Sequence, residues 1–160
     1  YESLAEKGRA AVSRPTVLTG NSWRGTWYVP GGKSFMARLL ADAGADYLWR
    51  SDTTSGGVPL DFESVLDRGR NADYWINTGV WESIDDALKA DERHAAFKAL
   101  QAGRVYNHNA RVNVHGGNDF WETGVVQPHR VLADLMKIFH PEWVPDHEMI
   151  WYRKLDPAEP

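Results

Sequence analysis

The chain has 160 residues, of which 42% are hydrophobic and 25% are charged, a composition typical of one globular domain rather than of a disordered or fibrous chain. Its formal net charge is −4, from 18 basic and 22 acidic residues, which argues against a nucleic-acid-binding protein because such proteins carry basic surfaces. Cysteine does not occur, which excludes disulfides, thiolate metal sites and cysteine nucleophiles. The eight tryptophans are unusual, and their large rings and N–H donors suit recognition surfaces as well as cores.

The first quarter of the chain predicts a helix, a strand and a second helix. Residues 2–13 have apolar side chains at helical spacing, and Pro15 ends that helix because the residue before a proline is pushed out of the α region. Residues 16–19 form a short β-branched run that indicates a strand. Residues 22–29 are compatible with a turn or with a second short strand, and residues 33–43 again show helical spacing.

Strands and helices alternate through the rest of the chain. A short strand is predicted at 47–49, followed by a polar turn over 51–57. Asp61 is suited to cap a helix over 62–70, and an apolar strand follows at 73–77. Three further helices are predicted: one that begins at Ser83, one over 92–101 and one over 125–139. Two further strands are predicted at 105–106 and 149–152. This alternation predicts an α/β fold, a three-layer Rossmann-like lobe with a central, largely parallel sheet and helices on both faces.

A long polar segment, residues 104–124, has no helical period after its first residues. It contains the pair Gly116-Gly117 and, near its end, Phe120 and Trp121. A long loop inside a compact domain is usually functional or disordered, and the aromatic residues argue against disorder. We therefore predict that this segment is a recognition loop.

Ligands of parallel α/β sheets bind beyond the carboxyl ends of the strands. Three predicted segments fall there, namely residues 20–27, 77–82 and 107–122. The residues singled out in these segments are Arg24 and five aromatic residues, Trp23, Trp27, Trp81, Phe120 and Trp121. An arginine between tryptophans suits an anionic or planar ligand, and a surface arginine beside core tryptophans is the alternative interpretation.

Sequence motifs for catalysis are mostly lacking. Residues 31–34 resemble the end of a phosphate-binding loop, but Trp27 stands where that motif requires a glycine. The recognition loop contains donors for a metal ion or for acid–base chemistry, His108, His115, Asp119 and Glu122. Loop histidines are more often solvated and loop carboxylates more often cap turns, so we predict neither a metal site nor a catalytic residue.

Two stretches carry a resemblance to a known family, LDFESVLDRGRNADYWINTG at 60–79 and GRVYNHNARVNVHGGNDFWETGVVQPHRVLADLMKIFHPEWVPDH at 103–147. With these stretches in this order, the chain resembles the substrate-binding proteins of ABC importers for iron–siderophores, haem and cobalamin. This is the class with a helical linker, and the similarity is to the forms found in Bacteroidetes-type bacteria. That family has a helix with a glutamate, here Glu63, before an Asn-Pro-Asp turn, in which Ala72 replaces the proline. Its late helix ends in a His-Pro-Glu turn, matched at 140–142.

The resemblance implies two α/β lobes joined by a long helix, with the ligand between them. Residues 1–14 would be the end of the linking helix, 15–155 the C-terminal lobe and 156–160 a tail, and the N-terminal lobe would be missing from this sequence. Glu63 matches the carboxylate that docks on the membrane permease, although the helix dipole also favours a glutamate there. The residues that match the cleft of the family are Trp23, Arg24, Trp27, Trp81, Asn118, Asp119, Phe120, Trp121 and Glu122.

The function implied is that of a non-enzymatic solute-binding component, which captures an iron chelate, haem or a corrinoid and delivers it to permease subunits in the inner membrane. The resemblance also implies a periplasmic location, a lipoprotein tether and no resident cofactor. Two alternatives stay open. A hydrolase-like enzyme would use Asp119, Glu122 or His115 and would have a perturbed pKa in its cleft. A tryptophan-rich interaction domain would instead expose a contiguous aromatic patch.

Overall fold

The computed structural model describes residues 1–157, so residues 158–160 of the expected tail 156–160 lie outside the described part. The centre of the molecule is a five-stranded sheet in the order β4-β1-β6-β7-β8. Four strands run parallel, and β8 pairs antiparallel with β7 at one edge. The strand bounds are β1 Thr16–Thr19, β4 Asp46–Tyr47, β6 Tyr74–Ile76, β7 Val105–Asn107 and β8 Arg153–Lys154.

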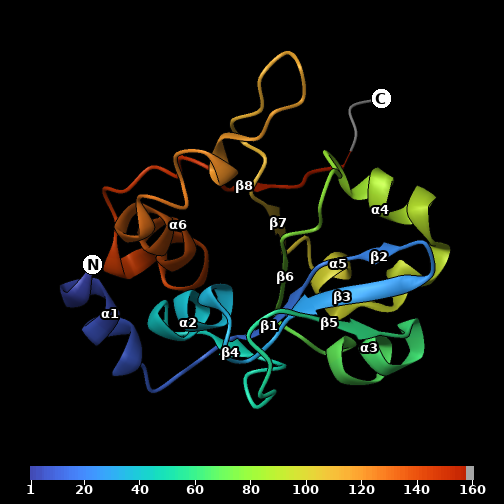
Figure 1. Ribbon diagram of the computed structural model, residues 1–160, viewed down its shortest axis with the longest axis horizontal. Coiled ribbons are helices and arrows are strands. Elements are labelled where there is room, and N and C mark those ends of the chain that lie inside the picture. Colours follow the sequence, from blue (N-terminus) through green and yellow to red (C-terminus); the bar gives the residue numbers. More distant parts are fainter. Residues whose placement is uncertain (158–160) are drawn as a thin grey trace.

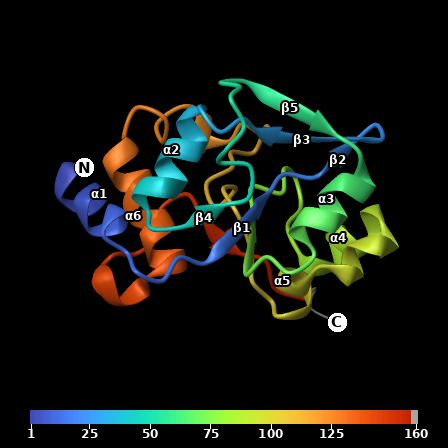
Figure 2. The ribbon, with the colours of Figure 1, turned by 90° about the horizontal axis from the view of Figure 1, so that it is seen from below.

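Helices cover both faces of this sheet (Figures 1 and 2). On one side, three helices pack against one another: α1 (Glu2–Arg9), α2 (Phe35–Asp42) and α6 (Pro128–Phe139). On the other side lie α3 (Phe62–Gly69), α4 (Ile84–Ala90), the 3-10 helix η1 (Glu92–Ala96) and α5 (Lys98–Gln101). Two further 3-10 helices are η2 (Asp119–Trp121) and η3 (Pro141–Trp143). The prediction of an α/β fold with a largely parallel sheet between two helical layers is confirmed.

A second, smaller sheet lies beside the carboxyl edge of the central one. It has the order β2-β3-β5 and is antiparallel, with β2 at Ser22–Trp23, β3 at Thr26–Pro30 and β5 at Gly57–Leu60. The prediction left open whether 22–29 is a turn or a strand, and the structure shows a hairpin. The sequence prediction did not include β5, because Gly57 and Pro59 have low β propensity and this edge strand depends on pairing with β3.

Several predicted boundaries were wrong. The first helix ends at Arg9 instead of 13, and the last begins at Pro128 instead of 125. The predicted helix over 92–101 divides into η1 and α5, because Phe97 between them has extended backbone angles. The predicted strand at 47–49 is β4, which ends at residue 47.

The last predicted strand, 149–152, is displaced to β8 because the side chain of Asp134 occupies its backbone donors. Asp134 lies on α6 and its side chain is fully buried. Its carboxylate accepts the backbone N–H groups of Ile150, Trp151 and Tyr152 at 2.8–3.2 Å, and it lies 2.6 Å from Nε2 of His147. These N–H groups therefore donate to a side chain of α6 instead of to the backbone of a neighbouring strand.

The core between the sheet and α3–α5 is an aromatic cluster. Trp27 stacks on Trp75 with 5.6 Å between the ring centroids, and both side chains are fully buried. Their indole N–H groups donate to the carbonyl oxygens of Thr19 and Gly20, at the end of β1. His94 packs against both rings and donates its Nδ1–H to a backbone carbonyl of α4, and burial lowers its pKa. A neutral imidazole is thus part of the apolar core.

Gly8 allows α1 to lie against the carboxyl end of α2. A Cβ atom at this position would lie 1.7 Å from the carbonyl oxygen of Asp42, closer than any real contact. In an unpacked helix, alanine is more favourable than glycine by about 1 kcal/mol, so the effect of packing has the opposite sign to that of propensity. Gly8→Ala should therefore destabilise the protein, by about 1–3 kcal/mol, because α1 must move away from α2.

Chemical denaturation of the wild type and Gly8→Ala measures this difference. Gly57→Ala is the matched control, because a Cβ atom at Gly57 meets no atom within 4 Å and its φ is not positive. Unchanged stability of Gly8→Ala would mean that α1 is not held closely against α2.

Candidate functional site

A large cavity opens where the parallel strands end. Its volume is about 1150 Å³, larger than the ~300–1,000 Å³ of pockets that hold drug-sized molecules. Its floor includes Gly20 after β1, Asn77 after β6 and His108 after β7. The cavity thus lies beyond the carboxyl ends of three neighbouring strands, where α/β sheets bind ligands.

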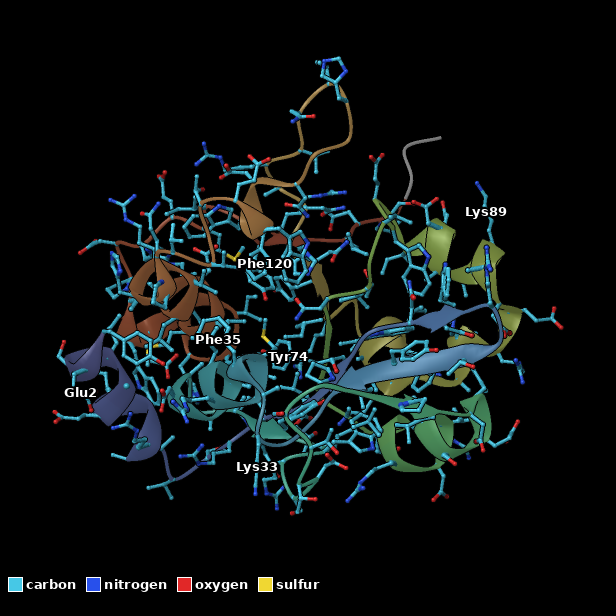
Figure 3. All side chains as sticks on the ribbon, viewed as in Figure 1. Glu2, Lys33, Phe35, Tyr74, Lys89 and Phe120 are labelled. Atoms are coloured by element: carbon cyan, nitrogen blue, oxygen red, sulfur yellow. The ribbon has the colours of Figure 1, made fainter. Side chains whose placement is uncertain are left out.

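Four segments build the walls around this floor. The small sheet contributes Tyr28 and Gly57, the amino end of α2 contributes Phe35, the segment after β6 contributes Val80, and the recognition loop contributes Trp121. Figure 3 shows Phe35 from α2 and Phe120 from η2 approaching the central region from different elements. Because these walls come from distant parts of the sequence, the site exists only in the folded chain.

Backbone conformation brings the floor residues close to the walls. Gly20 has φ +85°, and a Cβ there would lie 2.5 Å from the carbonyl oxygen of Tyr28, so only glycine allows this approach of β1 to β3. Asn77 adopts φ 57°, a left-handed conformation that asparagine tolerates. Its Oδ1 accepts a hydrogen bond from the hydroxyl of Tyr152 at 2.9 Å, which holds the turn after β6.

His108 is the buried titratable side chain of the cavity. Its side chain stacks on Phe120 with 4.5 Å between the centroids and meets Trp121 and Tyr152 edge-on. The residue is 7% exposed, and within residues 1–157 its Nδ1 has no hydrogen-bond partner. Burial lowers the pKa of His108 to about 4, so the imidazole is neutral at pH 7.

Side-chain amides order the recognition loop. Asn118 donates its Nδ2–H to the carbonyl oxygen of His108 and accepts the N–H of Phe120, which fixes η2 against the end of β7. Asn113 accepts the N–H groups of His115 and Gly117 in the turn at the tip. The tip projects away from the body of the molecule (Figure 1). The predicted loop is thus held by its own side chains, and part of it forms the cavity wall.

The predicted contacts from this loop divide into two groups. Asn118, Phe120 and Trp121 line the cavity. Asp119 accepts hydrogen bonds from the Thr123 hydroxyl at 2.5 Å and from the indole N–H of Trp151 at 2.9 Å, and these bonds lower its pKa. Asp119 is therefore a structural acceptor.

The remaining predicted contacts lie outside the cavity wall. Trp23 and Arg24 are at the turn between β2 and β3, where the guanidinium carbon of Arg24 lies 4.6 Å from the Trp23 ring centroid. Glu122 is exposed beside η2. The placement of Trp27 and Trp81 on the cleft surface needs correction, because both side chains are buried in the aromatic core below the cavity. Contact of any of these residues with a ligand stays a prediction.

Sequence reasoning missed most of the apolar wall. Tyr28 is 49% exposed between two inward-facing residues of β3, and Phe35 is 52% exposed at the start of α2 although its spacing suggested the core. Val80 is 87% exposed and follows the left-handed Gly79. The alternation in β3 was the available signal, because it places Tyr28 on the face opposite to Trp27.

Glu63 lies away from the cavity, in the first turn of α3. Its side chain is 79% exposed, and its carboxylate is 3.7 Å from the guanidinium of Arg93. Arg93 itself is held by Asp91 and stacks over Phe62, with 3.9 Å to the ring centroid. Glu63 is therefore presented on the surface beside a fixed arginine.

Within residues 1–157, no group of three or more histidines and carboxylates is placed to hold a metal ion. None of the described helices is both long enough and apolar enough to cross a membrane.

A family model described as periplasmic binding protein matches residues 2–112. The chain belongs to this family. Two uncharacterized lipoproteins of Methanocaldococcus jannaschii resemble this binding protein, with 24% identity over 131 residues and 27% over 161 residues. These matches cover 80% and 96% of the chain but only 30% and 39% of the two relatives. The binding protein therefore spans well under half the length of these relatives.

Solved structures share the fold of this binding protein. A periplasmic solute-binding protein and the TroA-like protein FepB, both from Veillonella parvula, align with TM-scores of 0.64 and 0.63 at 15% and 20% identity. The alignments cover 91% and 96% of this chain and 43% and 52% of those chains. Helicobacter pylori CeuE with bound Ni(II) aligns with a TM-score of 0.62 at 15% identity, over 92% of this chain and 44% of CeuE. The predicted resemblance to periplasmic solute-binding proteins is confirmed at the level of family and fold.

Proposed function

We propose that this binding protein is the solute-binding component of an ABC importer and that its ligand is an iron–siderophore, haem or a cobalamin-type molecule. The main support is the cavity of about 1150 Å³ at the carboxyl edge of the sheet, in a chain of this family. Helicobacter pylori CeuE, which shares this fold, was solved with Ni(II) bound, and this agrees with a ligand that contains a metal ion. The role we propose is capture and delivery, without catalysis.

We also propose that a second α/β lobe of the same protein closes the cavity. The partial coverage of the relatives supports this arrangement, and so does the open position of the site, whose walls include half-exposed aromatic side chains. In this proposal residues 1–14 are the end of the linking helix and residues 15–155 are the C-terminal lobe. The lipoprotein relatives support a periplasmic protein with a membrane tether.

The cavity gives little support to the enzyme alternative. Its one carboxylate among the described lining residues is Glu82, and its one imidazole, that of His108, is neutral and enclosed by rings. Asp119, one of the carboxylates proposed for acid–base work, is occupied by Thr123 and Trp151. These groups suit binding better than proton transfer.

Trp121→Ala should weaken ligand binding about tenfold or more, because the indole is 62% exposed on the cavity wall and its truncation removes a large apolar contact. Calorimetric titration of the intact protein with a ferric siderophore, haemin and cobalamin measures the affinities. Leu88→Ala is the control, since Leu88 is an apolar side chain of α4 that is 37% exposed and lies outside the cavity wall. Absence of binding by all three compounds would contradict the proposed function.

Glu63→Ala should impair uptake while leaving ligand affinity unchanged, if the exposed carboxylate docks on the permease. Transport assays with the reconstituted importer, together with calorimetric affinities, separate the two effects. Glu6→Ala provides the control, because Glu6 is an exposed glutamate on α1. A loss of ligand affinity in Glu63→Ala would refute a docking role.

A further inference from the structure

The lining of the cavity carries little charge. Among the described residues that line it, the acidic and basic side chains are Glu82 and His108, and neither lysine nor arginine is present. Burial lowers the pKa of His108 to about 4, so this side chain carries no charge at pH 7. The fixed charge of the wall is therefore the single negative charge of Glu82.

Glu82 is available to a ligand. The residue is exposed, and in the described part of the chain its carboxylate makes no hydrogen bond or ion pair. Its backbone is held instead, because its N–H donates to Asp86 and its carbonyl oxygen accepts from Arg153. Glu82, part of the cavity lining, thus combines a fixed backbone with an exposed carboxylate.

The nearby cations are directed elsewhere. Arg153 donates to Asn109 and to the Glu82 carbonyl, and Arg111 lies 3.4 Å from the carboxylate of Asp119. Lys33 precedes the lining residues Ser34 and Phe35 but is not itself among the residues that line the cavity. The amino end of α2 adds at most about half a positive charge, which the Glu82 carboxylate outweighs.

The apolar walls also disfavour an anionic ligand. Tyr28, Phe35 and Trp121 present half-exposed rings from three different elements, and Val80 and Val125 also line the cavity. An anion placed here would lose hydration without gaining a charged partner. The faces of aromatic rings attract cations and accept flat apolar groups.

We propose that the ligand face bound by this cavity is broad, apolar and neutral or cationic, so that the cavity selects against polyanionic ferric chelates. This inference rests on the proposed function and selects within its ligand classes. Neutral or cationic corrinoids and cationic ferric hydroxamates fit the cavity, and ferric tricatecholates do not.

The test compares chelates of different charge on the intact protein. Calorimetric titrations use cyanocobalamin, which is neutral, ferrioxamine B, which is cationic, and ferric enterobactin, which is trianionic. We expect the neutral or the cationic probe to bind at least tenfold more tightly than the trianionic one. Tighter binding of ferric enterobactin would overturn this inference and leave the proposed function standing. If none of the probes binds, the proposed function fails, and this inference fails with it.

Charge variants test the same inference independently of ligand shape. Glu82→Gln should weaken a cationic probe about fivefold and leave a neutral probe unchanged. Val80→Lys, at a lining residue that is 87% exposed, should weaken the cationic probe and strengthen the trianionic one by a similar factor. Val12→Lys is the control, because Val12 is fully exposed and lies outside the cavity wall. Thermal unfolding verifies that each variant is folded, and equal effects of Val80→Lys and Val12→Lys would contradict a local role of charge.

Discussion

Replacing Asp134 with alanine should lower the free energy of unfolding by about 3–5 kcal/mol, a large part of the ~5–15 kcal/mol typical of a domain. The carboxylate is fully buried and accepts the N–H groups of Ile150, Trp151 and Tyr152. Alanine would leave these buried donors without acceptors, and each unsatisfied donor costs about 1–3 kcal/mol. His147 would lose its partner at 2.6 Å as well.

Urea denaturation followed by circular dichroism measures this loss. Asp134→Asn retains one acceptor oxygen and should be destabilised less than Asp134→Ala. Asp146→Ala is the control, since this exposed aspartate lies in the same segment of the chain and its loss should change stability by no more than about 0.5 kcal/mol. A loss below about 1 kcal/mol in Asp134→Ala would show that water replaces the carboxylate.

The second large effect is a dependence of stability on pH that originates at His108. Its pKa is about 4 in the folded chain, against about 6.5 in the unfolded chain. Below pH 6.5 the unfolded chain takes up a proton that the folded chain refuses, so the free energy of unfolding falls as the pH falls towards 4. The shift corresponds to a loss of about 3 kcal/mol across this range. His94, whose pKa is also lowered by burial, adds a loss in the same direction.

His108→Phe keeps an aromatic ring beside Phe120 and removes the titrating group. Its free energy of unfolding should therefore fall less than that of the wild type between pH 7 and pH 4, by about 3 kcal/mol. Comparing the two proteins is necessary because hydrogen-bonded carboxylates such as Asp61 and Asp91, whose pKa values are lowered, also lose their stabilising contribution in acid. Parallel pH profiles for wild type and variant would contradict a neutral, buried His108.

The sequence predicted those elements that depend on local interactions. Asp61 caps α3 by accepting the N–H of Ser64, and Ser83 caps α4 together with Asp86, as residue type and position indicated. The segment 149–152 was assigned to a strand because its composition is apolar. Its true partner, Asp134, lies on a helix, and no local pattern shows that contact.

The candidate site was predicted in position but only partly in composition. The carboxyl ends of β1, β6 and β7 follow from the alternation of strands and helices, and the cavity lies there. Which aromatic rings face the ligand depends on the phase of each strand and on how the small sheet packs. Trp27 and Tyr28 are neighbours in sequence, yet one belongs to the core and the other to the cavity wall. The sequence prediction chose Trp27 as a ligand contact from its residue type and did not choose Tyr28.

The contact between α1 and α2 also has a mechanical consequence. Besides the close approach at Gly8, the carboxylate of Asp42 accepts hydrogen bonds from the Tyr1 hydroxyl at 2.6 Å and from Nε of Arg9 at 2.9 Å, so both ends of α1 are tied to one buried side chain. Arg14 donates to carbonyl oxygens at the end of the same helix. In the two-lobe arrangement proposed above, torque applied to α1 would pass into α2, whose amino end lines the cavity. Residues 2–9 would then move with α2 as one rigid unit, and the bending between the lobes would occur outside these residues.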